Sequence, residues 1–372
     1  MNLTEPSSGP RRPASAAMRL VSSRQFQSIV SAIPGLRRLA RRDGEALFDL
    51  VAGFVHSQVL WSVVELKLLH RLFDGPLGAG ALARDTGIPT ERMTILCDAA
   101  VALGLLSRRR GGDYALARKG AAILGVPGLE AMVSHHSVLY RDLSDPLALL
   151  RGEETELSRF WPYVFGAGAA ADPDTARRYS QLMTDSQALV AEETLRRIDL
   201  SSAERILDIG GGTGAFLIAL GARHPAPQLH LFDLPAVVPA AEAAFAGAGL
   251  SGRVDITAGS FRDDPLPEGA DVVTLIRVLY DHTDATVLAL LRKVHAALPP
   301  GGRVIVSEPM TGGDRPNRSG NAYFAFYCMA MGTGRARDPA SIRALLAQVG
   351  FASIADHGTT RPFVSHVLSA RK

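Results

Sequence analysis

Apolar residues recur at helical spacing from Gly44 to Phe73, and Gly75-Pro76 ends the pattern. The spacing predicts one long helix, or two helices that break near Gly53. Such a helix carries more apolar surface than one small domain can cover, so core packing and a subunit interface both remain open for it. The apolar positions of the pattern are Leu47, Val51, Phe54, Val55, Val59, Val63, Leu66, Leu69 and Leu72.

Residues 78–125 alternate short helices with turn residues and end in a charged hairpin with a return strand from Tyr114 to Leu116. This order is typical of a winged-helix module. In a DNA-binding regulator the second helix would carry arginine, asparagine or glutamine to contact base edges. The helix predicted from Thr90 to Leu103 offers only Arg92 of that set, beside Glu91. The pattern therefore favours packing and dimerisation for this module over nucleic-acid binding.

Residues 126–200 are mostly helical in pattern, and after Ser201 strands alternate with helices. Such alternation predicts a doubly wound parallel sheet with helices on both faces, and ligands bind such sheets at the carboxyl ends of the strands. We expect a basic flexible arm at 1–43, a helical winged-helix-like dimerisation and substrate-lid domain at 44–195, and a ligand-binding domain at 196–372. The expected strands are 205–209, 228–232, 254–258, 271–279 and 303–308; the expected helices are 215–223, 236–246, 285–297 and 339–349.

Composition adds that the chain is a well-cored globular protein, since 47% of its 372 residues are hydrophobic and 21% are charged. The net charge of +3 is unevenly placed. The first 43 residues hold eight arginines against Glu5 and Asp43, and the remainder carries 32 basic and 35 acidic residues. The basic character thus belongs to a terminal arm, which weakens any interpretation as an electropositive nucleic-acid-binding domain.

Cysteine usage and hydropathy bear on location. Cys97 and Cys328 lie far apart in apolar surroundings, so neither a disulfide framework nor a thiolate metal site is expected, and a reducing cytoplasm fits. No stretch of eighteen residues is uninterruptedly apolar, because Asp49, His56 and Glu65 interrupt the most hydrophobic segment. We therefore expect a chain that does not span a bilayer.

A glycine-rich corner follows the first predicted strand of the sheet domain, in the run Leu207 to Gly214. Gly210 and Gly212 would permit a tight turn and close approach of a ligand to the backbone. The corner also matches the glycine pattern of dinucleotide-binding proteins in its permissive form, so an NAD-dependent reductase is an alternative. Asp208 would place a carboxylate beneath the loop, which suits a cationic amino-acid end better than a pyrophosphate. Asp233 ends the next strand, where it can accept both hydroxyls of a ribose.

This combination resembles the first two motifs of S-adenosylmethionine-dependent methyltransferases. The runs "LDIGGGTGAF", "FDLPAVV", "AGSF", "RVLYDH" and "SEPM", after a winged-helix module, resemble the cation-independent small-molecule O-methyltransferases, a family that includes acetylserotonin and plant caffeate-type enzymes. The resemblance covers residues 45–372. It implies a Rossmann-like class I methyltransferase sheet, S-adenosylmethionine as cofactor, a homodimer and no metal.

Two C-terminal runs resemble one bacterial branch of that family, whose members methylate the tertiary 1-hydroxyl of acyclic carotenoids. These are "LIRVLYDHTDATVLALLRKVHAALPPGG" and "NAYFAFYCMAMGTGRARDPASI". The implied function is therefore carotenoid O-methylation. A polyketide phenol or a tetrapyrrole acceptor, with O- or C-methylation, remains open, and so do the two other classes, an NAD-dependent reductase and a winged-helix regulator.

The resemblance also assigns roles to residues. Asp233 takes the ribose, Ser260 and Phe261 take the adenine, and Arg277 matches a cofactor-site arginine. The family's general-base histidine is replaced by Tyr280. The carboxylate that orients that histidine is matched by Glu308, whereas a second family glutamate is replaced by Ala336.

A tyrosine at the base position changes the expected chemistry. A tertiary alcohol is a much weaker acid than a phenol, so its proton must leave with or after the methyl transfer. We expect Tyr280 to aim the acceptor oxygen in a dry pocket and a nearby imidazole to take the proton. His282 is the first candidate if it shares one side of an extended segment with Tyr280, and His135 or His136 is the second.

The acceptor pocket should be apolar and open at one end. Candidate lining residues are Tyr323 to Tyr327, Met329 and Met331, although helical spacing also suits plain core packing. If the acceptor is a water-insoluble polyene, the arginine-rich arm would act as a weak tether to anionic lipid. The expected location is cytoplasmic, with weak peripheral contact at the inner membrane.

Overall fold

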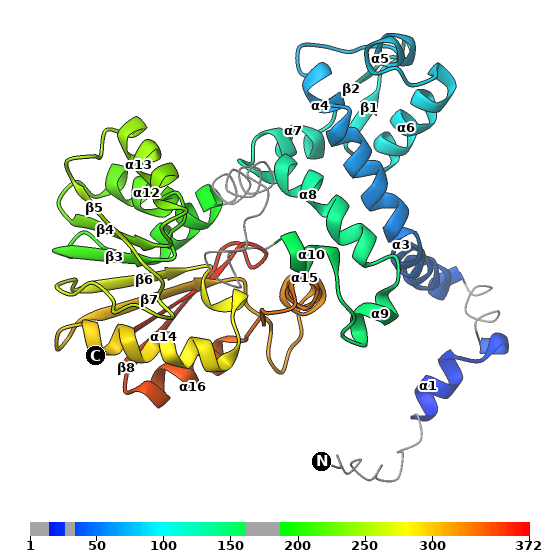
Figure 1. Ribbon diagram of the computed structural model, residues 1–372. Helices are drawn as coiled ribbons and strands as arrows, with labels where there is room; N and C mark the ends of the chain where they lie inside the picture. The colour runs from blue at the N-terminus through cyan, green and yellow to red at the C-terminus, as the bar shows by residue number, and fades with distance from the viewer. Residues whose placement is uncertain (1–14, 27–33, 161–186) are drawn as a thin grey trace.

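The computed structural model describes residues 15–26, 34–160 and 187–372. Within these ranges the chain forms a helical N-terminal unit and a unit built on a seven-stranded sheet (Figure 1). The order of elements therefore confirms a mostly helical region followed by an α/β sheet.

The long apolar helix is α3, Pro34–Glu65, and it begins ten residues earlier than the apolar pattern predicted. A short helix α1, Ala16–Val21, precedes it within the basic arm. The break comes at Lys67, whose backbone adopts a left-handed conformation with φ 53°, before α4 at Leu68–Arg71. Of the two alternatives, one long helix is confirmed and a break near Gly53 is wrong, since that glycine lies inside continuous helix.

The winged-helix order is confirmed by α5 (Ala79–Thr86), α6 (Thr90–Ala102) and the antiparallel pair β1 (Leu106–Arg108) and β2 (Tyr114–Leu116). Met93, Cys97 and Ala100 recur every three or four residues on α6, and all three are fully buried. They pack in one core with Leu68 and Leu69 of α4. The C-terminal part of α3 contributes Val63 to the same core.

Four further helices lead towards the second unit: α7 (Arg118–Leu124), α8 (Leu129–Asp142), α9 (Pro146–Leu150) and α10 (Glu156–Phe160). Helix α8 contacts α3 on one side and α15 (Ala325–Met331) of the sheet unit on the other. Figure 1 shows α8 and α10 between the two units. This helix pair therefore forms the boundary at which the two units meet.

The sheet has the strand order β5-β4-β3-β6-β7-β9-β8. Its strands are β3 (Arg205–Ile209), β4 (Gln228–Asp233), β5 (Val254–Ala258), β6 (Val272–Ile276), β7 (Arg303–Glu308), β8 (Ala352–Gly358) and β9 (His366–Arg371). The first five pair in parallel as expected, whereas β9 is antiparallel to both of its neighbours. The sheet is thus mixed, and the sequence pattern did not predict β8 and β9.

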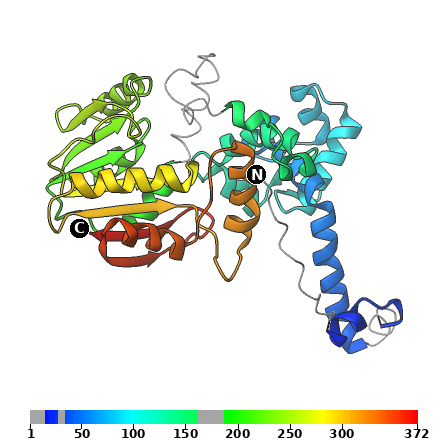
Figure 2. The same ribbon diagram turned by 60° about the horizontal axis from the view of Figure 1, so that its bottom comes forward.

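Helices cover both faces of the sheet. Helices α12 (Ala215–Arg223) and α13 (Val238–Gly247) lie on one face, and α14 (Asp284–Ala297) and α16 (Pro339–Val349) lie on the other (Figures 1 and 2). Alternate strand residues serve the two cores, since Ile206 packs with the first pair and Leu207 with the second. The helix at 187–197 packs into the first core through Val190 and Leu195, so the expected domain boundary at 195/196 cuts through this helix.

The segment after β6 differs from the expected extended strand. β6 ends at Ile276, and a one-turn 3₁₀ helix, η2, follows at Leu279–Asp281. After β7, the element η3 (Arg318–Phe324) runs directly into α15. Both segments lie at the carboxyl ends of their strands, where the ligand site of such a sheet is expected.

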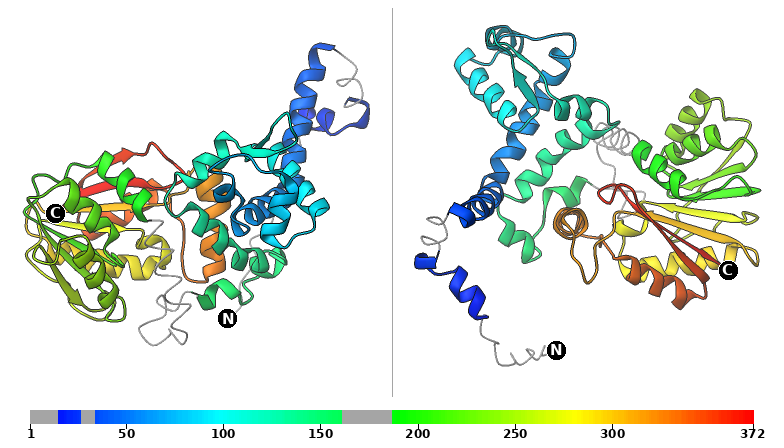
Figure 3. Two further views of the ribbon diagram at one scale, coloured as in Figure 1. Left: turned by 90° about the horizontal axis from the view of Figure 1, so that it is seen from above. Right: turned by 180° about the vertical axis from the view of Figure 1, so that it is seen from behind.

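The first half of α3 projects away from the other helices of the N-terminal unit, and α1 lies near its free end (Figures 2 and 3). Residues 41–51 are exposed on every side, and Leu50 and Phe54 are 77% and 72% exposed. By length and mean hydropathy alone, Ala40–Glu65 would suffice to cross a membrane, and only 11% of its most apolar window is buried. An exposed apolar rod of this kind needs a covering surface.

Candidate active site

The glycine corner after β3 is shaped for a ligand. Gly210, Gly212 and Gly214 have positive φ values of 68°, 61° and 80°, which L side chains rarely adopt. A Cβ at Gly214 would lie 2.2 Å from the ring of Phe245, so this glycine allows α12 to pack closely. A Cβ at Gly212 would meet nothing within 4 Å. The loop therefore leaves open space beside Gly212 for a bound group.

Asp208 lies beneath this corner, as its spacing predicted. It is fully buried, and its Oδ1 accepts a hydrogen bond of 2.6 Å from the Thr274 hydroxyl. Its Oδ2 has no hydrogen-bond partner among the described residues. Burial raises the pKa of Asp208 to about 7. The site thus holds a buried carboxyl group that a cationic ligand would favour in its ionised form.

Asp233 ends β4 beside the same loop. Its carboxylate accepts backbone hydrogen bonds of 2.7 Å each from Gly212 and Leu234. Burial raises its pKa to about 6, while the two backbone hydrogen bonds oppose that shift. These bonds fix the carboxylate at the strand end, with remaining lone pairs for hydroxyl donors.

The predicted adenine residues lie after β5. The Ser260 hydroxyl donates to Asp263 at 2.8 Å and accepts from the Arg262 backbone at 3.2 Å, so it stabilises the local turn. Phe261 is half-buried and packs edge-on against His282, with ring centroids 5.2 Å apart. Phe261 and His282 therefore form one aromatic wall on this side of the sheet.

His282 does not share an extended segment with Tyr280, because the intervening residues form η2. Its Nδ1 lies 3.1 Å from the Arg262 guanidinium, and the ring is buried. Burial, with Arg262 and Arg337 nearby, lowers the pKa of His282 to about 4. The structure thus places this imidazole beside Phe261 rather than beside the tyrosine hydroxyl.

Tyr280 is paired with Arg277 instead. The Arg277 guanidinium donates to the tyrosine hydroxyl at 3.0 Å and lies 5.6 Å from the ring centroid. The Arg277 backbone has φ 58°, an uncommon conformation for a residue with a side chain, and its N–H donates to Ser307 at 2.8 Å. Burial holds the pKa of Tyr280 well above its usual range, so the hydroxyl stays a neutral phenol.

Glu308 anchors the turn that carries Tyr280. Its carboxylate accepts the backbone N–H groups of Val278, Leu279 and Tyr280 at 3.1, 2.7 and 3.0 Å. Among the described residues its hydrogen bonds go to this backbone and not to an imidazole. Burial raises the pKa of Glu308 to about 7 despite these bonds. The family resemblance paired this carboxylate with a histidine. In this structure it instead positions the turn that carries Tyr280, which we call the tyrosine turn.

Arg337 holds the opposite side of the same turn. This arginine is 4% exposed, and its guanidinium donates to the carbonyls of Leu279 and His282 at 2.8 Å each. It also pairs with Asp284 at 2.7 Å. The Tyr280 carbonyl accepts from the Arg335 backbone at 2.8 Å. The backbone N–H groups of this turn are therefore held by Glu308 at the end of β7, and its carbonyl groups are held by the segment before α16.

His135 and His136 lie on α8 and face α15 and η3. The two imidazole Nε2 atoms lie 2.8 Å from the Tyr327 hydroxyl and 2.6 Å from the Tyr323 hydroxyl, respectively. Burial lowers the pKa of each histidine to about 4, so both are neutral. These Tyr–His pairs join the helical unit to the sheet unit next to the Tyr280 turn.

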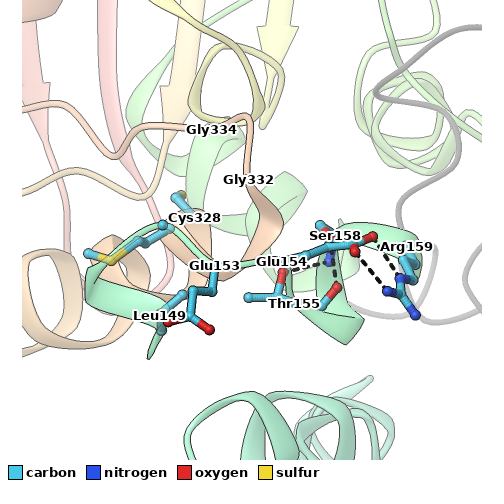
Figure 4. A pocket seen from close by; sticks show the side chains of 11 residues that line it. Leu149, Glu153, Glu154, Thr155, Ser158, Arg159, Cys328, Gly332 and Gly334 are labelled. Carbon is cyan, nitrogen blue, oxygen red and sulfur yellow. Dashed lines mark hydrogen bonds and ion pairs between the residues drawn. The ribbon is translucent and has the colours of Figure 1, made fainter. Parts of the chain in front are cut away.

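The expected apolar lining is only partly found. Met331 is fully buried in a core with Leu139 and Leu157, and Tyr327 belongs to the same cluster. A cavity of about 710 Å³ lies between the α9–α10 segment and α15 (Figure 4). Its lining includes Met329, Cys328 and Gly334, with Thr155 and Ser158 opposite, and a Glu154–Arg159 ion pair at 2.8 Å. Of the predicted lining residues, Met329 alone is among those that line this cavity.

The cavity reaches the back of the tyrosine turn. A Cβ at Gly334 would lie 2.5 Å from the Tyr280 carbonyl, and the Cys328 sulfur lies 3.8 Å from the same oxygen. No group of three or more potential metal-ligating side chains occurs among the described residues. The site therefore combines a ligand corner, a tyrosine turn and an adjoining cavity.

Sequence reasoning missed Arg337 and Lys293. The Lys293 ammonium donates to three carbonyls after β5, those of Phe261, Arg262 and Asp264, at 2.8 to 2.9 Å. Both residues act on backbone oxygens that only the folded chain brings together. For Arg337 the only signal was its place in the segment 334–337, where the family glutamate is replaced by Ala336 between two arginines.

Comparisons with known proteins agree with this geometry. The family model described as the O-methyltransferase domain matches residues 140–352, and that of the O-methyltransferase dimerisation domain matches residues 48–124. The chain is 56% identical to demethylspheroidene O-methyltransferase of Cereibacter sphaeroides, covering 95% of this chain and 93% of that protein. It is 34% identical to acetylserotonin O-methyltransferase of Mus musculus, covering 84% of this chain and 85% of that protein.

Among solved structures, the chain is similar to human N-acetylserotonin methyltransferase in complex with SAM. The TM-score is 0.77 at 26% identity, covering 89% of this chain and 97% of that chain. The mitomycin 7-O-methyltransferase has the same fold, with a TM-score of 0.75 at 23% identity.

Proposed function

The chain belongs to the O-methyltransferase family, and from this premise we propose that it transfers a methyl group from S-adenosylmethionine to a hydroxyl group of an acyclic carotenoid. The acceptor class rests on the 56% identity to a demethylspheroidene O-methyltransferase over nearly the whole chain. The hydroxyl is the tertiary one at position 1, as in demethylspheroidene and hydroxyneurosporene. Family membership removes the reductase and the regulator from consideration.

The corner after β3 fits S-adenosylmethionine. The unpartnered Oδ2 of Asp208 suits a ligand with a cationic amino-acid end, and the open space at Gly212 admits its close approach. Asp233 is fixed where it can accept ribose hydroxyls, and Phe261 offers a flat face to the adenine. When bound, the cofactor supplies a sulfonium methyl group that needs no further activation.

The chain's own residues position the acceptor and exclude water. Tyr280 lies 3% exposed on a turn whose backbone is held by Glu308 and Arg337. Its phenol oxygen already accepts a hydrogen bond from Arg277, and the phenol can contact the oxygen of a bound alcohol. A fixed, dry hydrogen-bonding site can supply most of the rate enhancement for a strong methyl donor. His282 and His136 remain candidates for a supporting role in this mechanism.

The cofactor proposal predicts that the wild-type protein binds S-adenosylhomocysteine and that Asp233→Ala loses this binding by tenfold or more. The variant removes the carboxylate that accepts the ribose hydroxyls. Isothermal titration measures both affinities. Asp314→Asn, which changes an exposed carboxylate on the loop after β7, is the control, and its affinity should stay within about threefold of wild type. Equal affinity of Asp233→Ala and wild type would contradict the assigned ribose site.

The acceptor proposal predicts methyl transfer to an acyclic 1-hydroxycarotenoid. Incubation with labelled S-adenosylmethionine and a panel of hydroxycarotenoids, phenols and tetrapyrroles should label the carotenoid as an ether. Label in a phenol or a tetrapyrrole alone, or in a carbon–methyl bond, would overturn the acceptor assignment while leaving the family intact.

We further propose that the basic arm contacts anionic lipid, where a polyene acceptor would reside. Met18, Leu20 and Val21 of α1 are 59%, 53% and 46% exposed, and Arg19 and Arg24 lie beside them. Exposed apolar side chains next to arginines are typical of a segment that rests on a charged membrane surface. Deleting residues 1–33, which leaves α3 intact, should reduce sedimentation with anionic vesicles but not with neutral ones. Unchanged sedimentation would exclude the tether.

A further inference from the structure

One side-chain oxygen on the tyrosine turn remains without a donor. Oδ1 of Asp281 is inaccessible to solvent and has no hydrogen-bond partner among the described residues. The backbone of this residue is fixed, since its carbonyl accepts from the Thr333 hydroxyl at 3.2 Å. A buried carboxyl oxygen left without a donor is costly to folding, and such atoms in native structures are rare. An oxygen of this kind, next to the residue that is proposed to aim the acceptor, is available to receive a proton from a bound ligand.

The groups around Asp281 come from every element packed against it. Arg277 and the Tyr280 hydroxyl stabilise its ionised form, and the Glu308 carboxyl disfavours it. The charge of Asp281 also acts on Tyr327 and Cys328 of α15, whose pKa values it raises. The guanidinium, the phenol and the carboxyl therefore form one continuous chain, from Arg277 through Tyr280 to Asp281.

We propose that Asp281 takes the proton of the acceptor hydroxyl during methyl transfer, while Tyr280 aims the acceptor oxygen. This inference rests on the proposed function. The three imidazoles considered from the sequence are each engaged elsewhere: His282 with Arg262, His135 with Tyr327, and His136 with Tyr323. Asp281 is the carboxyl group adjoining Tyr280 that keeps an oxygen free to receive a proton.

The step balances in atoms and charge. A bond forms between the alcohol oxygen and the methyl carbon, and the bond from that carbon to the donor sulfur breaks, with the electron pair staying on sulfur. The alcohol proton passes to the Asp281 carboxylate, which becomes a neutral acid. One positive and one negative charge disappear together, so no net charge is created in a medium of low dielectric constant. No metal and no oxidant are required.

Charge pairing also predicts how the free protein behaves. Burial holds the pKa of Asp281 well above its usual range, and Glu308 adds to this, so both favour the protonated form before the cofactor binds. A cationic ligand in the same pocket favours the carboxylate and should expel that proton. S-Adenosylhomocysteine lacks the sulfonium charge and should not.

The test measures protons released on binding to the full-length protein. Titration calorimetry near pH 7, in two buffers of different ionisation enthalpy, gives this number for S-adenosylmethionine and for S-adenosylhomocysteine. On binding S-adenosylmethionine, wild type should release up to about one proton more than on binding S-adenosylhomocysteine. Asp281→Asn should bind both ligands and show no difference. Asp314→Asn, an exposed carboxylate on the loop after β7, should keep the wild-type difference.

Turnover gives the second measurement. Because general-base catalysis contributes about 10²- to 10⁴-fold, Asp281→Asn should lower kcat by at least 10²-fold with little change in acceptor KM. Asparagine resembles the protonated acid, so the fold should persist, and Asp281→Ser is a second uncharged variant should it not. If an uncharged variant binds both ligands yet keeps the wild-type proton difference, or turns over within threefold of wild type, the role of Asp281 is disproved. If wild type binds neither ligand, the proposed function fails instead.

Discussion

Asp208 shows how a single residue can lower the stability of the fold at a functional site. Its folded-state pKa of about 7 lies above the value of about 3.9 for a free aspartate, so the folded protein holds this proton more tightly than the unfolded chain does. That contribution to stability is complete below about pH 4. It is lost as the pH rises through about 7.

Asp208→Asn should therefore be more stable than wild type at pH 8, by about 2–4 kcal/mol, and similar to it at pH 4.5. Denaturant unfolding at the two pH values measures the difference. The variant should also bind S-adenosylhomocysteine more weakly, because an amide cannot pair with its ammonium group. Asp314→Asn should change neither property. A stability difference that does not vary with pH would show that Asp208 ionises equally in both states.

The residues that the sequence could predict are those fixed by a strand end. Asp208 and Asp233 lie where the spacing placed them, because the carboxyl ends of β3 and β4 meet beside the same glycine loop. His282 could not be placed this way, since one 3₁₀ turn directs its ring to Phe261. Asp281 could not be singled out either, because its significance depends on which of its oxygens lacks a donor.

At the scale of elements, η2 is a turn whose backbone is fixed by side chains from other elements. Arg337→Met would leave the buried carbonyls of Leu279 and His282 without their donor. Loss of these bonds and of the pairing with Asp284 should cost about 3 kcal/mol of unfolding free energy. Because Tyr280 lies on this turn, kcat should fall by tenfold or more, while S-adenosylhomocysteine affinity changes by less than about threefold.

Arg335→Met is the matched control. Its side chain is 66% exposed and pairs with the same Asp284, and its backbone bond to Tyr280 is retained. It should lose less than 1 kcal/mol of stability. Arg337→Lys should recover only part of the loss, since a lysine cannot reach both carbonyls in the planar geometry of a guanidinium. Wild-type turnover in Arg337→Met would mean that Glu308 alone holds the turn.

Elements with a strong apolar period were predicted well, including β5 at one edge of the sheet, whereas β8 at the other edge was not. The bounds of β3, β5, β7, α12 and α16 agree with their sequence patterns, because each is bracketed by turn residues and packs in the core. β8 lies at the sheet edge, and its residues are mostly exposed, so no apolar alternation marked it. The start of α3 was missed because its first turns carry arginines, which interrupt the apolar pattern.

At the scale of the whole molecule, the open question from the sequence was what covers the long apolar helix. Leu47, Leu50, Val51 and Phe54 recur every three or four residues on the exposed half of α3. The dimerisation domain of the family begins at residue 48, and the protein is accordingly a homodimer. We therefore expect a second copy of the chain to cover this apolar face.

Phe54→Glu should therefore convert the dimer to a monomer at micromolar concentration, because burial of one such aromatic ring is worth about 1.5–3 kcal/mol for each copy. Sedimentation velocity measures the change. Asp49→Lys, on the other side of the helix, should remain dimeric. A dimeric Phe54→Glu would place the interface on another surface, such as the exposed Leu147 and Leu150 of α9.

The exposed N-terminal half of α3 has a practical consequence for every measurement on this enzyme. Where a fold is completed by a second copy, mass action makes its melting temperature rise with the logarithm of protein concentration. Dilution into an assay would then inactivate the enzyme slowly, and addition of inactive protein that still dimerises would protect it. Rates obtained at nanomolar and micromolar concentrations should therefore be compared only after the dimer fraction is known.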